Sequence, residues 1–218
     1  MEQQILNLIN LQWVSPGLDL FMAALSSYAL WMIPIVVTVA LVVIFGGFKA
    51  RFMLVVMAVA VGLGGNVLCE IIKHKVHRPR PREMLANVRR VELQRTKPVV
   101  MGLFKPADVQ LSRPNPGTVT GHSFPSSHAF NNFCVATILA LFYRKRGWLA
   151  FIPAALIAYS RVYVGAHWPS DAVAGAFLGC GVGLLTVALF DYLWRTQGSK
   201  IVPKFFAAHP TLLGPQMA

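Results

Sequence analysis

The stretch ALSSYALWMIPIVVTVALVVIFGG, residues 24–47, contains no charged side chain and decides the fold class of this chain. About 20 consecutive apolar residues are enough for a helix to cross the hydrocarbon core of a bilayer. Four further stretches have the same character, at residues 52–72, 127–143, 148–166 and 171–194. The sequence therefore predicts an all-α fold, a polytopic bundle of transmembrane helices.

The composition agrees with a membrane protein. Hydrophobic residues make up 56% of the 218 residues and charged residues 13%, whereas charged residues reach about a quarter in ordinary soluble domains. Because the apolar stretches recur along the whole chain, we expect residues 1–218 to form a single integral-membrane domain. The three cysteines lie in apolar segments without CxxC spacing, so neither a disulfide framework nor a zinc site is predicted.

The N-terminal segment leaves the expected number of spans at five or six. Apolar side chains in residues 5–11 indicate a short interfacial helix. The run of residues 18–45 is long for one tilted helix, and Pro34 could divide it. Residues 18–28 then form a partial sixth span in one interpretation and part of the first span in the other.

Residues 74–126 form the one long non-apolar segment of the sequence, a basic extramembrane loop. The net charge of the chain is +12, and +8 of it lies between Lys73 and His128. Such an excess suggests nucleic acid, anionic lipid headgroups or a phosphorylated substrate as the partner. Because the loop joins two predicted spans, we expect a membrane lipid phosphate rather than nucleic acid. The basic residues are Lys73, Lys75, Arg78, Arg80, Arg82, Arg89, Arg90, Arg95, Lys97, Lys105 and Arg113.

Three polar segments lie at the ends of predicted spans on one membrane face. They are KHKVHRPRP at 73–81, PSSH at 125–128 and SRVYVGAHWPSD at 160–171. The loop connects the first two, and two crossings of the membrane return the chain to the third. Each alone has an ordinary explanation, as headgroup contacts, a helix cap or a structural hydrogen bond. Together they contain the parts of a phosphate site.

The first group of these parts binds the phosphate. Lys73, Arg80 and Arg161 supply positive charge for its oxygens, and each arginine can donate two hydrogen bonds to one group. The N–H groups of Ser126 and Ser127 open a helix, where unpaired donors favour an anion. We therefore predict that these five residues bind the phosphate of the substrate.

The second group carries the chemistry. Near pH 7 one imidazole can be neutral and nucleophilic while another is protonated and acidic. Asp171 follows His167 by four residues and can hold one ring nitrogen as a donor, which leaves the other free to attack phosphorus. His128 can protonate the departing oxygen and then activate water. We predict His167, His128 and Asp171 as catalytic residues. Because no clustered carboxylates accompany them, no metal or cofactor is expected.

In these segments the chain resembles the type 2 phosphatidic acid phosphatase superfamily, over about residues 50–194. The family pattern is Lys-x6-Arg-Pro, then Pro-Ser-Gly-His, then Ser-Arg-x5-His-x3-Asp. Ser127 replaces the usual glycine and keeps the backbone N–H. The resemblance implies a helical bundle, a phosphohistidine intermediate on His167, leaving-group protonation by His128 and no required metal. The matched residues are Lys73, Arg80, Pro81, Pro125, Ser126, His128, Ser160, Arg161, His167 and Asp171.

The expected function is hydrolysis of a lipid phosphate or diphosphate, with undecaprenyl diphosphate as the first choice of substrate. The alternatives are phosphatidylglycerophosphate, phosphatidate and the 1-phosphate of lipid A. A lipid-to-lipid phosphotransferase would use the same nucleophile. A non-catalytic lipid-binding or transport protein would ordinarily lose His167 or His128, and both are present. The continuous apolar spans argue against a vanadium-dependent haloperoxidase, a soluble class with the same motif logic.

Basic residues outside the loop predict the orientation. The short connections on the opposite face are rich in Lys and Arg, and the positive-inside tendency places such connections in the cytoplasm. We expect a multi-pass protein of a bacterial inner membrane, with the catalytic face toward the periplasm or the cell exterior. The basic loop opposes this tendency, and we attribute its excess charge to the phosphate site. The basic residues of the opposite face are Lys49, Arg51, Arg144, Lys145, Arg146, Arg195 and Lys200.

Overall fold

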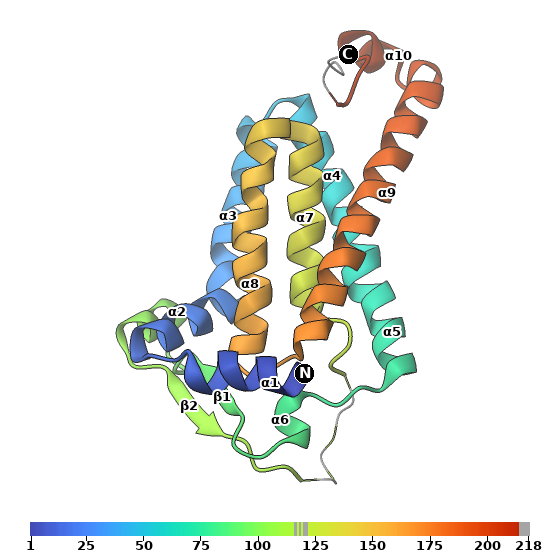
Figure 1. The fold of residues 1–218 in the computed structure, drawn as a ribbon. Coiled ribbons are helices and arrows are strands. Elements are labelled where there is room, and N and C mark those ends of the chain that lie inside the picture. The colour runs from blue at the N-terminus through green and yellow to red at the C-terminus, as the bar shows by residue number, and fades with distance from the viewer. Residues whose placement is uncertain (116, 118, 120–121, 214–218) are drawn as a thin grey trace.

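A computed structural model describes residues 1–115, 117, 119 and 122–213, and it is a bundle of long helices with a small cap at one end (Figure 1). The cap holds the short N-terminal helices and most of the basic loop. The expected all-α, polytopic helical bundle is therefore confirmed. The long helices are α3 (Tyr28–Phe45), α4 (Phe48–Val61), α7 (Ser127–Tyr143), α8 (Phe151–Tyr163) and α9 (Pro169–Ile201).

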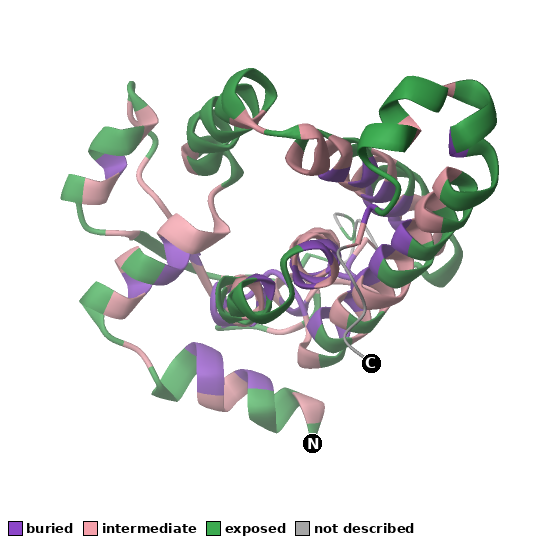
Figure 2. Cartoon of the chain, turned by 90° about the horizontal axis from the view of Figure 1, so that it is seen from above, coloured by how far each residue is buried: buried purple, intermediate pink, exposed green. Residues whose placement is uncertain are grey.

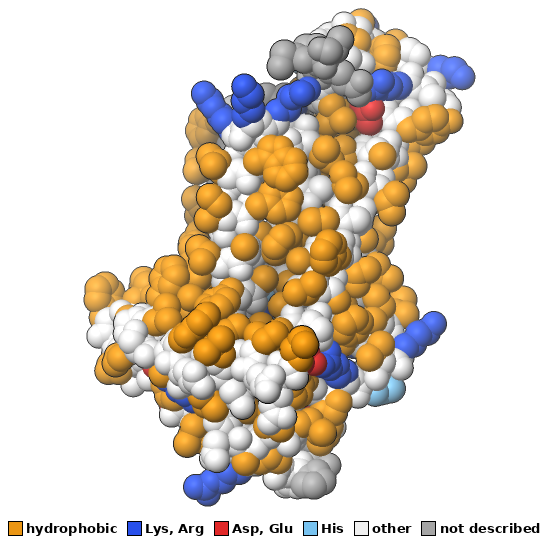
Figure 3. All heavy atoms as spheres, viewed as in Figure 1, with side chains coloured by type: hydrophobic (Ala, Val, Ile, Leu, Met, Phe, Trp, Pro, Cys, Tyr) orange, Lys and Arg blue, Asp and Glu red, His pale blue; other side chains and the backbone are white. Residues whose placement is uncertain are grey.

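Hydrophobic side chains cover the long helices, while Lys and Arg gather toward the two ends of the molecule (Figure 3). In the described part of the chain three helical segments are long and apolar enough to cross a membrane, or four if a bent N-terminal pair counts as one span. The three are Tyr28–Phe45, Phe48–Met84 and Pro169–Ile201. The chain is thus a multi-pass membrane protein. Because α7 and α8 have 17 and 13 residues, the count of five or six spans stays a prediction.

The second of these segments is not one regular helix. After α4 the chain continues through a π-helical segment, η2 (Gly62–Leu68), into α5 (Cys69–Val76). His77 ends α5 in the left-handed conformation, with φ of 49°. The basic loop thus begins at the cap end of the bundle, one turn after Lys73.

The N-terminal segment folds across the cap end of the bundle (Figure 1). It contains α1 (Glu2–Asn7), the π-helical turn η1 (Leu8–Gln12) and α2 (Pro16–Ser26). The chain bends by 117° between the end of η1 and the start of α2. The Ser27 hydroxyl accepts the N–H of Leu30 at 3.4 Å and caps α3. The run of residues 18–45 is therefore divided at Ser27. The expectation for Pro34 was wrong, since Pro34 lies inside α3.

The basic loop folds into a small structure of its own rather than a plain connection. It holds α6 (Pro81–Met84), an antiparallel pair of strands, β1 (Arg89–Glu92) and β2 (Asp108–Leu111), and the 3₁₀ helix η3 (Val99–Phe104) between the strands. The strands pair Arg89 with Leu111 and Glu92 with Asp108.

A buried polar cluster fastens β1 to the N-terminal helices and to α8. The amide of Asn10 donates to the carbonyl oxygens of Arg89 and Tyr163, at 2.9 and 2.6 Å. Asp19 accepts from the Arg89 guanidinium and from the Tyr163 hydroxyl, each at 2.6 Å. Because every partner in this cluster is buried or half-buried, the contacts hold three separate parts of the chain in one arrangement.

Glycines allow α9 to lie against α7 at close range. Viewed along the bundle, buried residues face its interior and exposed ones lie outside (Figure 2). A Cβ at Gly175 of α9 would lie 2.5 Å from the Ser126 carbonyl oxygen, and one at Gly179 would collide with the carbonyl oxygen of Phe130. Small residues permit such backbone contact between membrane helices. The contact brings the beginning of α7 beside the beginning of α9.

We predict that Gly179→Ala lowers the free energy of unfolding by about 1–3 kcal/mol, the usual cost of overpacking a tight contact. Gly181→Ala is the matched control, because the space around that position on α9 is open. Alanine is preferred to glycine in helices by about 1 kcal/mol, so the control should be neutral or stabilising. Thermal unfolding in detergent micelles measures both. Equal midpoints for the two variants would show that α7 and α9 are not held this closely.

Candidate active site

The turn between α8 and α9 carries His167 into the interior. Gly165 in this turn has φ of +69°, and a Cβ there would lie 2.6 Å from the Arg89 carbonyl oxygen of β1. Glycine is therefore needed both for the backbone conformation and for the close approach to β1. Pro169 follows at the first position of α9, where its fixed φ suits a helix start. His167, between them, is 4% exposed.

The imidazole of His167 is held in one tautomer. Its Nδ1 lies 2.8 Å from the carbonyl oxygen of Ser123. Because a carbonyl can only accept, Nδ1 carries the hydrogen and Nε2 keeps its lone pair. Burial, together with the positive charges of Arg161 and Arg80, lowers the pKa of His167 to about 4. The ring is therefore neutral near pH 7, which is the form that can act as a nucleophile.

Asp171 is fully buried, and donors surround its carboxylate. Oδ2 accepts from the Ser123 hydroxyl at 2.5 Å and from the Trp168 N–H at 2.9 Å, and Oδ1 accepts from Arg78 at 2.7 Å. Oδ2 lies 3.7 Å from Nδ1 of His167, which is within ion-pair range but too long for a hydrogen bond. The sequence predicts Asp171 as the acceptor for the ring N–H. The structure corrects this, because the Ser123 carbonyl is the closer acceptor.

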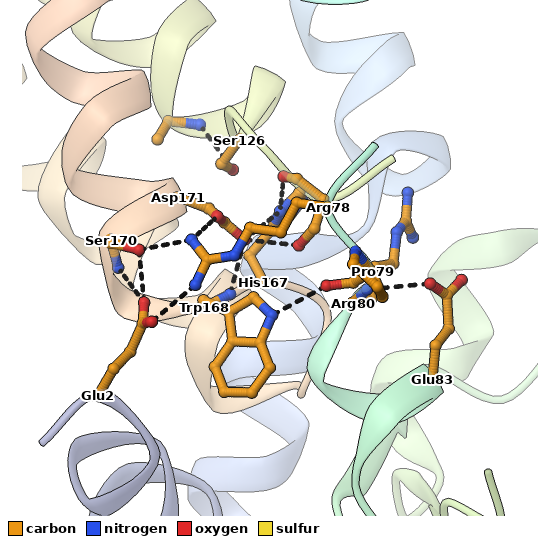
Figure 4. A network of polar contacts seen from close by, with 12 residues as sticks. Glu2, Arg78, Pro79, Arg80, Glu83, Ser126, His167, Trp168, Ser170 and Asp171 are labelled. Atoms are coloured by element: carbon orange, nitrogen blue, oxygen red, sulfur yellow. Dashed lines mark hydrogen bonds and ion pairs between the residues drawn. The ribbon is translucent and has the colours of Figure 1, made fainter. Parts of the chain in front are cut away.

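Arg78 connects this carboxylate to the N-terminal helix α1 (Figure 4). Its Nη1 donates to Asp171 and to the Ser170 hydroxyl, and its Nη2 lies 2.6 Å from Oε2 of Glu2. Glu2 also accepts from the N–H and the hydroxyl of Ser170, at 3.1 and 2.5 Å. These contacts dock α1 on the first turn of α9, next to Asp171.

Arg78, Ser123 and Glu2 are absent from the site residues that the sequence predicts. Arg78 has a visible signal, since it lies in the first polar segment, two residues before Arg80. The signal for Ser123 is weak, namely that it lies two residues before Pro125, where the second polar segment begins. Glu2 has none, because it is 76 positions from Arg78 in the chain and the bend of the N-terminal segment brings the two together.

The three predicted phosphate-binding cations act on His128, and two of them, Arg80 and Arg161, also act on His167. Lys73 is buried, and it acts electrostatically on His128 together with Arg80 and Arg161. Arg161 donates through Nη1 to the hydroxyl of the last residue of α2. The Nε atoms of Arg80 and Arg161 are buried without a hydrogen-bond partner among the described residues. Buried donors of this kind are rare unless a ligand or water satisfies them.

Lys73 also pairs with a carboxylate of its own helix. Its Nζ lies 2.7 Å from Oε1 of Glu70, one turn earlier in α5. Part of its charge is therefore already neutralised, whereas no carboxylate contact of Arg80 or Arg161 occurs among the described ion pairs. The two arginines thus carry more of the unneutralised positive charge than Lys73 does.

The beginning of α7 supplies the second histidine. Ser126 is the N-cap, and its N–H donates to the Asp171 carbonyl oxygen at 3.0 Å. That N–H is therefore not free for a phosphate, which corrects the expectation for the Ser126 backbone. The Ser127 hydroxyl is buried. His128, in the first turn of α7, lies near His167.

The site combines a neutral imidazole, a second imidazole and three cations. Among residues 1–115, 117, 119 and 122–213, no group of three or more His, Cys, Asp or Glu side chains could hold a metal ion. That the protein needs no metal or cofactor stays a prediction from the sequence. The chemistry that these groups suit is attack by imidazole on an anionic phosphorus centre.

Comparison with known proteins connects this geometry to a family. An undecaprenyl-diphosphatase of Sulfolobus acidocaldarius is 45% identical over 71 residues, which are 32% of this chain and 34% of that protein. A lipid A 4′-phosphatase of Bacteroides thetaiotaomicron is 41% identical over 86 residues, 38% of each chain. The aligned segments span about a third of the length of these curated relatives.

The fold has a counterpart among solved structures. LpxE of Aquifex aeolicus superimposes with a TM-score of 0.60 at 25% identity, over 86% of this chain and 94% of that one. The model of the PAP2 superfamily matches residues 49–195, which contain all three polar segments. This range also agrees with residues 50–194, over which the motifs resemble the family. The chain belongs to the PAP2 superfamily.

Proposed function

We propose that this chain is a membrane phosphatase that hydrolyses a lipid-linked phosphate or diphosphate, with His167 as the nucleophile. The observation that carries the proposal is the hydrogen bond from Nδ1 of His167 to the Ser123 carbonyl oxygen. It leaves Nε2 as a free base in a buried site where Arg161 and Arg80 supply positive charge. A phosphate held there would meet the nucleophile and the groups that stabilise its negative charge together.

The reaction has two steps. First, Nε2 of His167 attacks phosphorus, and the bond from phosphorus to the leaving oxygen breaks. His128 is in its protonated form once the phosphate anion is bound, and it gives the leaving oxygen that proton. Second, His128 removes a proton from water, which attacks the phosphohistidine, and the P–N bond breaks to release inorganic phosphate. Arg80, Arg161 and Lys73 stabilise the charge on the phosphoryl oxygens. Asp171 stabilises the positive charge that the ring carries while it is bonded to phosphorus.

For the substrate we propose undecaprenyl diphosphate, because a relative with 45% identity in the aligned segment has the name of an undecaprenyl-diphosphatase. Lipid A is the nearest alternative, since another relative is named a lipid A 4′-phosphatase. Phosphatidylglycerophosphate and phosphatidate remain further alternatives. In a phosphotransferase the hydroxyl or phosphate of a second lipid would take the place of water in the second step.

We predict that His167→Ala removes both turnover and the covalent phosphoenzyme. His128→Ala should be slowed by about 10²–10⁴-fold, the usual contribution of general acid–base catalysis. It should still form phosphohistidine from an aryl phosphate, whose leaving group needs little protonation. Rapid quench with labelled aryl phosphate, followed by peptide mapping, measures both. Label on His128, or label retained in His167→Ala, would reverse the assigned roles.

Arg78→Gln should lower kcat by about 10–100-fold, because a hydrogen bond to a charged group contributes about 1.5–3 kcal/mol. Without this guanidinium the charge of Asp171 is less neutralised and favours the imidazolium form of His167. The pKa of His167 then rises from about 4, and the acidic limb of kcat/KM moves to higher pH.

Two variants complete this test. Arg78→Lys keeps the charge and should shift the acidic limb less than Arg78→Gln does. Lys105→Gln is the control, since Lys105 is an exposed cation of the same loop. A uniform loss of rate at every pH would mean that Arg78 acts on the structure alone.

We also propose that residues 1–218 act as one domain in a bacterial inner membrane, with the site facing the periplasm or cell exterior. The contacts of Glu2 with the first turn of α9 support the single domain. The basic residues at the opposite end of the bundle support the orientation.

We predict that Lys97→Cys, in the exposed part of the basic loop, reacts with a membrane-impermeant maleimide in cells whose inner membrane is intact. Lys145→Cys, exposed at the other end of the bundle, should react after that membrane is opened. The opposite pattern for the pair would invert the orientation.

A further inference from the structure

A cavity of about 370 Å³ lies between the N-terminal helices, the end of α8 and the chain that follows β1. Its volume is in the range of small-molecule sites. Its polar lining includes Ser26, Arg82, Glu92, Arg95, Thr96 and Arg161, and we call it the arginine cavity.

The arginine cavity carries more positive than negative charge. Arg82, Arg95 and Arg161 line it, and among the described residues Glu92 is its one carboxylate. That carboxylate is already engaged, with Arg90 at 2.7 Å. Arg82 is near enough to Arg161 for their like charges to interact. Like charges brought together in a partly buried space are unfavourable unless an anion offsets them.

The cavity adjoins the catalytic residues. Arg161 lines it, and so does Ala166, the residue directly before His167. The other wall includes Ala29, in the first turn of α3. No residue of α3 is buried, as expected for a helix that faces lipid. A lipid whose phosphate is at His167 would therefore extend its headgroup through the cavity.

We propose that the arginine cavity binds a second phosphate of the lipid headgroup, separate from the phosphate that His167 attacks. The inference rests on the proposed function and narrows its substrates to lipids with two phosphates. Arginine suits this ligand, since its planar donors match phosphate oxygens in pairs. Phosphatidate, which has one phosphate, would leave the charge of the cavity uncompensated.

The test compares lipids that have two phosphates with lipids that have one. The pairs are undecaprenyl diphosphate and monophosphate, phosphatidylglycerophosphate and phosphatidate, and bisphosphoryl and monophosphoryl lipid A. In the pair hydrolysed fastest, the ratio of kcat/KM should favour the two-phosphate lipid. Arg82→Gln and Arg95→Gln should each lower that ratio by about 10–100-fold, as expected for a lost charged hydrogen bond. Lys105→Gln, an exposed cation of the same loop, should keep it.

An unchanged ratio in both arginine variants would overturn the proposal, as would an equal loss for Lys105→Gln. The two variants lie in different segments, α6 and the chain after β1, so a folding defect in one leaves the other as a test. Thermal unfolding midpoints identify such a defect.

A binding measurement separates this proposal from the proposed function. Non-hydrolysable prenyl lipids with a methylene diphosphonate or a single phosphonate headgroup are titrated into wild-type protein and Arg82→Gln. The Arg82→Gln change should weaken binding of the diphosphonate more than that of the phosphonate. If this difference is present while no lipid is hydrolysed, the phosphatase function fails and the subsite stands. If lipids are hydrolysed and the difference is absent, the proposed second-phosphate site is refuted and the phosphatase function stands.

Discussion

The carboxylate of Asp171 must be satisfied by donors because it is fully buried, and this requirement joins distant parts of the chain. Its donors come from the end of the basic loop, from the turn before α9 and from Arg78, which follows α5. Its own carbonyl oxygen accepts the N–H of Ser126 at the start of α7. One residue therefore fixes how all three polar segments meet. These hydrogen bonds position the residues of the site before a substrate arrives, as electrostatic stabilisation of a transition state requires.

The N-terminal helices complete the site from outside the matched family region, residues 49–195. Glu2 pairs with Arg78, and Asn10 and Asp19 fasten β1 to the end of α8. Because the turn that carries His167 packs on the Arg89 carbonyl oxygen, the position of β1 affects the position of the nucleophile. The cap is thus part of the scaffold that positions the candidate catalytic groups, and the basic loop serves structure as well as charge.

The distribution of charge explains why the basic loop differs from an ordinary membrane-surface segment. Cations that contact headgroups normally extend into water or lipid. Here Lys73 is buried, and the guanidinium Nε atoms of Arg80 and Arg161 have no partner within the described structure. Burying cations in this way is unfavourable for folding, and an anionic substrate would offset the cost on binding.

The sequence by itself determined the membrane bundle, and it predicted the main members of the candidate site. Water-soluble proteins rarely contain uncharged stretches as long as these, so the stretches predict membrane helices. Lys73, His128 and His167 lie near the ends of predicted spans on one membrane face, so the sequence also predicts that they come together. Helix boundaries were less predictable, since the Ser27 cap rather than Pro34 divides the first apolar run. Only the tertiary structure decided that the Ser123 carbonyl fixes the tautomer of His167 and that Glu2 reaches Arg78. Hydrogen bonds between residues far apart in the chain depend on how helices pack, and no local pattern in the sequence encodes that geometry.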